Sequence, residues 1–217
     1  MITYKGRQIP ETLEEIVAPK HTALIIHEIF NDLCAKGGVF DKLGRRVEVE
    51  KILSPVLALL DAAREKGVKV IYVRYTNFPD YSNMNDPLAL KYYDRILAKT
   101  VIPIDGTWGW ENLAAVAPQE GEPIIKKLRV DCFEQTNLDM ILRSNGIRTF
   151  VIVGLGAEVG IVPTVSTGQN LGYFCVAPED CMGAVDPSKI DVAKRFIGRY
   201  ASMPKASEIL KVWEASN

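Results

Sequence analysis

Short apolar runs bounded by polar residues or glycine recur along the chain and are typical of buried strands. Four of them are rich in Val and Ile, at Ala23–Glu28, Lys69–Arg74, Pro123–Lys127 and Thr149–Gly154, and a fifth strand is expected at Tyr173–Ala177. Because every run is short, we interpret them as strands rather than as helix segments.

The segments between these runs carry apolar residues at helical spacing. In Val49–Lys66 the apolar side chains fall on one face, and Gly67 follows as a stop signal. Thr136–Ser144 and Val185–Tyr200 show the same period. Strands that alternate with helices predict right-handed crossovers and a mostly parallel sheet with helices on both faces, which is an α/β fold.

The stretch from residue 76 to residue 110 is the least regular part of the chain. It is rich in Asn, Asp, Pro and Tyr, and we expect a loop there with one helix around Leu88–Ala98. Loops at the carboxyl ends of parallel strands are where ligands bind in this architecture. The sequence therefore predicts a ligand site at that edge of the sheet.

The composition is that of a globular protein, and we expect a single domain over residues 1–217. With 47% hydrophobic and 24% charged residues the chain can bury a sizeable core. The net charge is −1 and Lys and Arg are evenly spread, which argues against nucleic acid or a membrane surface as a partner and favours a small-molecule substrate. The first residues lack the apolar core of a signal peptide and no run approaches the ~20 apolar residues of a membrane span, so we expect a cytoplasmic protein.

Cysteine usage adds little chemistry by itself. The four cysteines show no C-x-x-C spacing, and only two histidines accompany them. We therefore expect reduced thiols and no structural zinc.

Ionisable residues stand at the ends of two predicted strands. His27 and Glu28 close the first, and Lys126 and Lys127 close the third. Structural alternatives exist for each, namely a carboxylate bridged to a neighbouring helix and a solvated, idle lysine. On neighbouring strands, however, Glu28 and Lys127 would form an ion pair that holds the lysine charged, ready to orient a substrate or to stabilise a developing anion.

The fourth strand runs into a Gly-rich turn, Gly154–Gly160, which leads into a helix beginning near Glu158. The first N–H groups of a helix are free, so this turn could bind an anion or an oxyanion. Alternatively, its glycines only allow a tight connection between strand and helix. The turn is not a dinucleotide fingerprint, because its third glycine is misplaced and its strand is not the first of a unit.

Three motifs in order resemble those of one superfamily. Thr22–Asp32 is similar to an apolar strand followed by D-M-Q-N-D, with Glu28 at the acidic position, and Lys127–Phe133 is similar to K-x-R-Y-S-A-F. Gly154–Ile161 is similar to G-V-x-T-x-x-C-V, with Gly160 in place of the cysteine, and residues 106–108 match a G-T-W element. Over about residues 20–200 the chain thus resembles the isochorismatase-like hydrolases, which include nicotinamidases, ureidoacrylate and other amidohydrolases, and isochorismatases.

The resemblance implies a three-layer α/β/α fold of Rossmann-like topology, a hydrolase of a small polar substrate, and a homodimer or homotetramer. In the cysteine members, Asp, Lys and Cys form a triad in which the thiolate attacks a carbonyl carbon. In this sequence the resemblance puts Glu28, Lys127 and Gly160 at the three positions of that triad. Because glycine supplies no nucleophile, we do not expect a thioester at position 160.

True isochorismatases also resemble this chain in having glycine at that place and a histidine before the acid, as in His27-Glu28. For that branch the resemblance implies that the acid protonates a vinyl ether and that water then adds to the oxocarbenium ion, with Lys127 binding a substrate oxygen. Glutamate is longer than aspartate by a methylene, and Val130 and Gly156 stand where isochorismatases have aromatic residues. The substrate therefore stays open.

No cofactor and no catalytic metal are expected, because residues 74–80 lack the Asp and His with which nicotinamidases bind metal after the second strand. Aromatic residues of the loops could line the pocket or pack against another subunit. The residues expected to bind substrate are His27, Tyr75, Trp108, Arg129, Gly156, Ala157 and Glu158.

Three functional hypotheses follow. The leading one is a hydrolase without a cysteine nucleophile, in which Glu28 is the general acid or base and Lys127 orients the substrate or stabilises charge. The second is C–N hydrolysis, in which Glu28 activates water and the backbone of residues 156–160 holds the oxyanion. The third is an inactive member that binds a small molecule or a partner.

Overall fold

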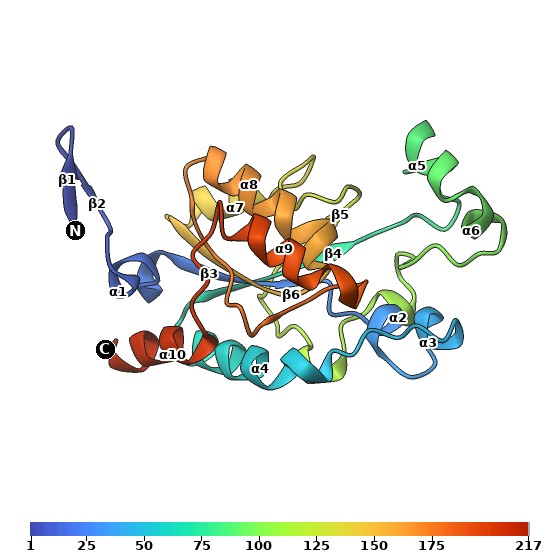
Figure 1. Cartoon of the computed structure of the whole chain (residues 1–217), viewed down its shortest axis with the longest axis horizontal. Helices are drawn as coiled ribbons and strands as arrows, with labels where there is room; N and C mark the ends of the chain where they lie inside the picture. Colours follow the sequence, from blue (N-terminus) through green and yellow to red (C-terminus); the bar gives the residue numbers. More distant parts are fainter. Residues whose placement is uncertain (217) are drawn as a thin grey trace.

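A parallel sheet lies at the centre of the computed structural model, which describes residues 1–216 (Figure 1). Across the sheet the order is β5-β4-β3-β6-β7, and β8 pairs with the end of β6. All of these pairings are parallel, so the predicted α/β fold with a mostly parallel sheet is confirmed. The strands are β3 (Thr22–His27), β4 (Lys69–Tyr75), β5 (Ile124–Lys127), β6 (Thr149–Leu155), β7 (Phe174–Val176) and β8 (Met182–Gly183).

Helices cover both faces of the sheet and bury the alternate side chains of its strands. Leu24 and Ile26 of β3 pack in one core with α4 (Glu50–Glu65) and α10 (Ala206–Ala215). The neighbouring Ala23 and Ile25 pack in the other core with α7 (Leu138–Ser144), α8 (Val162–Asn170) and α9 (Ile190–Ile197). Figure 1 shows these two helical layers below and above the sheet.

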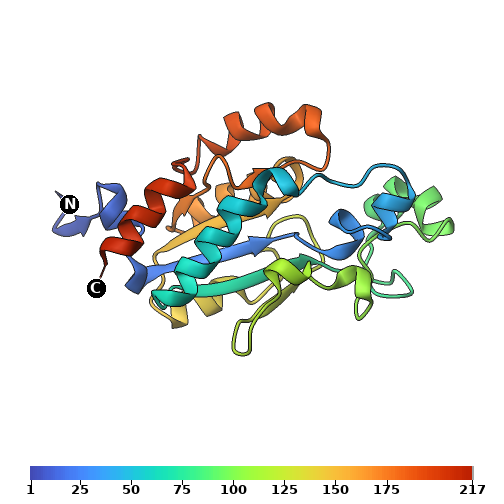
Figure 2. The same ribbon diagram turned by 90° about the horizontal axis from the view of Figure 1, so that it is seen from below.

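The two ends of the molecule carry different segments of the chain. Both termini lie at one end, while α5 and α6 lie at the opposite end, close to where β3 and β4 finish (Figures 1 and 2). That second end also carries α2 and α3. The remaining short elements are β1 (Ile2–Tyr4), β2 (Arg7–Ile9), α1 (Leu13–Ile16), η1 (Pro19–His21), α2 (Asn31–Cys34), α3 (Val39–Lys42), α5 (Asp86–Lys91), α6 (Tyr93–Leu97), η2 (Trp108–Trp110), η3 (Ala114–Val116), η4 (Ala157–Ile161) and η5 (Pro187–Lys189).

The structure differs from the sequence-based elements mainly at the boundaries. The single helix expected around Leu88–Ala98 is two short helices, and the helix expected over Val185–Tyr200 begins at Ile190 after the η5 turn. Pro187 explains the late start, since proline belongs in the first turn of a helix. The antiparallel β1–β2 hairpin, β8 and the helices α1, α2, α3 and α10 were not predicted. Within residues 1–216, none of the helices has both the length and the apolar character needed to cross a membrane.

The register of the sheet gathers the carboxyl ends of its central strands. His27 at the end of β3 pairs with Val73 of β4 and with Gly154 of β6. Tyr75 at the end of β4 pairs with Lys127 of β5. The three motifs therefore meet at one edge of the sheet, although more than a hundred residues separate the first from the last.

Candidate active site

The end of β3 directs two ionisable side chains into one cavity. Neighbouring residues of a strand normally point to opposite faces. Here His27 and Glu28 both line the cavity, and Glu28 has a left-handed backbone with φ of 59°. Its N–H still donates to Val73 O at 3.2 Å. A non-glycine residue in this conformation carries backbone strain, which commonly marks a functional position.

Glu28 and Lys127 form the expected ion pair, but the two strands are not neighbours as expected, because β4 lies between β3 and β5. The distance from Glu28 Oε1 to Lys127 Nζ is 3.1 Å, and both side chains are almost completely buried. The same carboxylate oxygen accepts the Tyr75 N–H at 2.7 Å, while Lys127 Nζ donates to Val130 O at 2.9 Å. Each charge is therefore compensated, which a buried ion pair requires.

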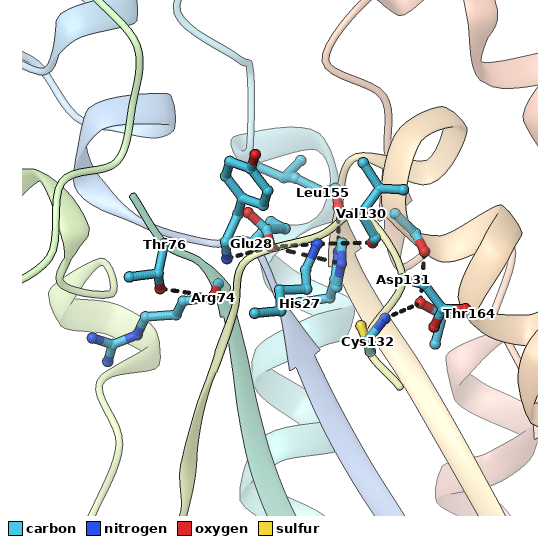
Figure 3. A network of polar contacts seen from close by, with 12 residues as sticks. His27, Glu28, Arg74, Thr76, Val130, Asp131, Cys132, Leu155 and Thr164 are labelled. Carbon is cyan, nitrogen blue, oxygen red and sulfur yellow. Dashed lines mark hydrogen bonds and ion pairs between the residues drawn. The ribbon is translucent and has the colours of Figure 1, made fainter. Parts of the chain in front are cut away.

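His27 is held by the neighbouring strand. Its side chain is fully buried, and Nδ1 lies 2.7 Å from the carbonyl oxygen of Leu155 (Figure 3). Its Nε2 has no hydrogen-bond partner among residues 1–216 and lies 3.7 Å from Glu28 Oε1. Burial, as the main cause, and the positive charge of Lys127, as the second, lower the pKa of this imidazole well below its usual value.

Gly160 lies against the imidazole ring of His27. A Cβ atom at position 160 would be only 2.4 Å from His27 Cε1 and 2.6 Å from Nε2. Ordinary contacts between carbon atoms are about 3.5–4.0 Å, so no side chain fits there while the ring keeps its place. The space into which a cysteine at 160 would project is thus occupied by His27.

Some backbone N–H groups of the turn that contains Gly160 donate hydrogen bonds within the turn. Gly156 is left-handed, with φ of 75°, and its carbonyl accepts the N–H groups of Val159, Gly160 and Ile161 at 3.1, 2.7 and 3.3 Å. Because this wide π-helical turn occupies the N–H groups of Val159 and Gly160, the backbone of residues 156–160 is only partly free to hold an oxyanion, which narrows the second hypothesis. The N–H groups of residues 156–158 have no acceptor within the described chain.

The cavity above these residues measures about 210 Å³, which suits a small substrate. His27, Glu28, Lys127, Gly156 and Gly160 line it at the sheet edge. Apolar and aromatic side chains form most of the remaining wall, together with two cationic residues from the α5–α6 segment: Phe30, Leu33, Phe40, Tyr75, Leu88, Lys91, Tyr92, Arg95, Val101, Ile102, Val130, Val159 and Val185.

Three cationic side chains and one carboxylate therefore face this space. Arg95 is half-buried, donates from Nη2 to Thr100 O at 2.7 Å, and has no partner for Nε within residues 1–216. Desolvation by burial lowers the pKa of its guanidinium. Because a partly desolvated cation without a carboxylate partner gains from a bound anion, this end of the cavity suits an acidic group.

Four of the expected substrate-binding residues lie away from the cavity wall. Trp108 is 52% exposed in the η2 turn, and Arg129 donates from Nη1 to Leu128 O and Asn83 O. Ala157 packs in a core, and the Glu158 carboxylate accepts the N–H groups of residues 185 and 186. Their contacts hold loops together, whereas His27, Tyr75 and Gly156 do line the cavity.

It was not predicted from the sequence that residues of the α5–α6 segment line the cavity, although the spacing of these residues indicates a shared helical face. Leu88, Lys91, Tyr92 and Arg95 are spaced at three or four residues, the spacing of one helical face. The sequence alone does not reveal that this face turns toward the end of β3. Only the folded chain places it across the cavity from the strand ends.

No cysteine of the chain is arranged as a replacement nucleophile. Cys132 of the second motif is fully buried, and burial raises the pKa of its thiol to about 12. A thiol with such a pKa is almost wholly protonated at neutral pH, and the thiol is a poor nucleophile. Among residues 1–216, no three His, Cys, Asp or Glu side chains are grouped closely enough to hold a metal ion.

Comparison with known proteins shows which family and which solved structures this chain resembles. The isochorismatase domain family matches residues 22–203. Ureidoacrylate amidohydrolase RutB of Rhizobium rhizogenes is 29% identical over 93% of this chain and 87% of its own length. The N-carbamoylsarcosine amidase of Thermoplasma acidophilum is 28% identical with a TM-score of 0.66, covering 85% of this chain and 96% of that one. A cysteine hydrolase of Pseudomonas syringae shares the fold with a TM-score of 0.81 at 24% identity, covering 93% and 96% of the two chains.

Proposed function

Because the chain belongs to the isochorismatase family of hydrolases, we propose that it hydrolyses a C–N bond in a small, carboxylate-bearing substrate without a thioester intermediate. The observation that carries this proposal is the buried Glu28–Lys127 pair beneath a cavity whose third corner, Gly160, has no side chain. The relatives named for ureidoacrylate and N-carbamoylsarcosine support the bond type, since both names denote ureido acids.

In the proposed reaction, water replaces the thiol as the nucleophile. The water oxygen bonds to the carbonyl carbon while the Glu28 carboxylate takes one of its protons. Lys127 and the N–H group of Gly156, which lines the cavity and has no acceptor within the described chain, stabilise the negative charge that develops on the carbonyl oxygen. The C–N bond then breaks as Glu28 returns the proton to the departing nitrogen.

The surroundings of Glu28 favour this reaction over vinyl ether hydrolysis. The vinyl ether route is suggested by the His27-Glu28 pair and Gly160, and it needs Glu28 to begin as a proton donor. In the structure Glu28 Oε1 accepts the Tyr75 N–H and faces the Lys127 ammonium. A carboxylate in those contacts is arranged to accept a proton.

The substrate carboxylate is proposed from the opposite end of the cavity. Lys91 and Arg95 line it there, and neither forms a salt bridge with a carboxylate in the described chain. A small ureido acid would place its carboxylate at Arg95 and its carbamoyl group at Glu28. The limited volume favours an acyclic molecule over a ring with several substituents.

The proposal is tested by assaying purified protein against ureido acids, primary amides and vinyl ethers, with product release as the readout. We expect turnover of ureido acids that iodoacetamide does not abolish, and no hydroxamate when hydroxylamine is added. Glu28→Gln is expected to lower kcat by about 10²–10⁴-fold, the usual contribution of a general base.

Lys127→Met is expected to be nearly inactive, and Lys126→Met is its matched control. Lys126 is the neighbouring lysine, but it is half-exposed and pairs with Asp105 at 2.8 Å. Turnover that survives Glu28→Gln unchanged would refute the role of Glu28. A wild type inert toward all three substrate classes would support the non-catalytic alternative instead.

A further inference from the structure

The ring of His27 is held in one tautomer by the strand beside it. Nδ1 lies 2.7 Å from Leu155 O, and a carbonyl oxygen can only accept a hydrogen bond. Nδ1 must therefore carry the hydrogen. In a neutral imidazole the other nitrogen is then a bare acceptor, so Nε2 presents a lone pair.

Several features keep this ring neutral. It is fully buried, and the Lys127 ammonium faces it across Glu28. Its pKa lies well below the usual value for these reasons. Nε2 thus remains an acceptor at neutral pH and has no donor within residues 1–216. A buried polar atom without a partner is uncommon in a folded protein, and here it belongs to a residue that lines the cavity.

Nε2 lies close to the point from which a nucleophilic side chain at position 160 would project. It lies 2.6 Å from where a Cβ at position 160 would stand, and 3.7 Å from Glu28 Oε1. That second distance is too long for a direct hydrogen bond. It is short enough for one water molecule to donate its two hydrogens to the two acceptors, leaving the lone pairs of its oxygen free for attack.

Resting on the proposed function, we propose that His27 holds the attacking water through Nε2 and so takes the place of the thiol. One O–H of the water donates to Nε2, and the other donates to Glu28. As the C–O bond forms, the proton passes to the Glu28 carboxylate and Nε2 keeps its hydrogen bond without being protonated. His27 orients the nucleophile, and Glu28 transfers the proton.

Two substitutions separate this role from a structural one. Gln can place an amide oxygen near the position of Nε2, whereas Met fills a similar volume without a comparable acceptor. We expect His27→Met to lower kcat by about 100-fold with little change in KM, the scale of misplacing a reacting group. His27→Gln is expected to retain activity to within about tenfold. Equal losses in both variants would overturn the proposal.

Two measurements that need no substrate complete the test. Nitrogen-15 NMR of the imidazoles should show His27 as the neutral Nδ1–H tautomer, assigned by loss of its signals in His27→Gln. A high-resolution crystal structure should show a water within hydrogen-bond distance of Nε2 and Glu28, absent in His27→Met.

The outcomes keep the two proposals apart. An Nε2–H tautomer, an imidazolium or a site without this water would overturn the role of His27, even if the enzyme hydrolyses ureido acids. The expected tautomer and water in a protein that hydrolyses no C–N bond would overturn the proposed function and, with it, the role of the water as nucleophile.

Discussion

Adding a single methyl group at position 160 should destabilise the protein through His27. The Cβ of Gly160→Ala would lie 2.4 Å from His27 Cε1, more than about 1 Å inside an ordinary carbon contact. The backbone of Gly160 is not left-handed, so the substitution adds no conformational strain of its own. The imidazole must therefore move, and movement breaks its 2.7 Å hydrogen bond to Leu155 O.

The magnitude follows from these two contacts. Forcing a methyl group into a packed site costs about 1–3 kcal/mol, and leaving a buried hydrogen-bonding group unpaired costs about 1–3 kcal/mol. We expect Gly160→Ala to lower the free energy of unfolding by about 2–6 kcal/mol. Once His27 is replaced by Ala, the nearest remaining atom is Val130 O at 3.4 Å, and the same methyl group should cost less than about 1 kcal/mol.

The assay is a double-mutant cycle of Gly160→Ala and His27→Ala, measured by urea unfolding. The expected coupling, the difference between these two costs, is about 1–6 kcal/mol, which exceeds the deviation of about 0.5 kcal/mol seen for independent sites. Gly198→Ala is the control, because Gly198 has an ordinary φ of −62° and its Cβ would meet no atom closer than 3.4 Å. If Gly160→Ala costs the same in both backgrounds, the ring does not occupy the site.

Arg95→Met should raise KM for substrates with a carboxylate by about tenfold or more and leave neutral amides nearly unaffected, as steady-state kinetics can show, with Arg45→Met as a control outside the cavity wall. As the pH is lowered below about 6.5, the free energy of unfolding should decrease more steeply in the wild type than in His27→Gln. The reason is that His27 of the unfolded chain binds a proton there, whereas the folded imidazole, with its lowered pKa, does not. The difference should reach at most about 1.4 kcal/mol per pH unit in urea titrations, and a steeper His27→Gln would contradict it. Trp213→Phe should cost about 1–3 kcal/mol in the same assay, since its buried Nε1 donates to Val17 O at 2.8 Å.

The sequence predicts the sheet and the ion pair for a shared physical reason. Buried parallel strands are continuous apolar runs, and β3 and β6 are buried along their whole length. The residues that follow such runs meet at one edge of the sheet. Glu28 and Lys127 could therefore be paired from their positions alone, and they lie 3.1 Å apart.

The contact between His27 and Gly160 could not be predicted in the same way. It joins residues that are distant in the chain, and it depends on the π-helical turn that follows the left-handed Gly156. No local pattern encodes the depth of that turn. Likewise, the spacing of Leu88, Lys91 and Arg95 indicates a helical face but not the cavity that it covers.

The contact between Gly160 and the His27 ring determines which substitutions a cysteine nucleophile at position 160 would need. Gly160→Cys alone would force its Cβ into the imidazole, and removing His27 alone would leave neither a thiol nor a water-holding acceptor. A cysteine enzyme could be recovered only by replacing His27 with a smaller residue at the same time. Glu28 imposes a further condition, because its longer side chain shifts the carboxylate by roughly an ångström relative to aspartate, a displacement that can cost about 100-fold in rate. The two departures from the cysteine triad, Glu28 and Gly160, are thus physically coupled to His27, and reverting either of them singly should lower activity.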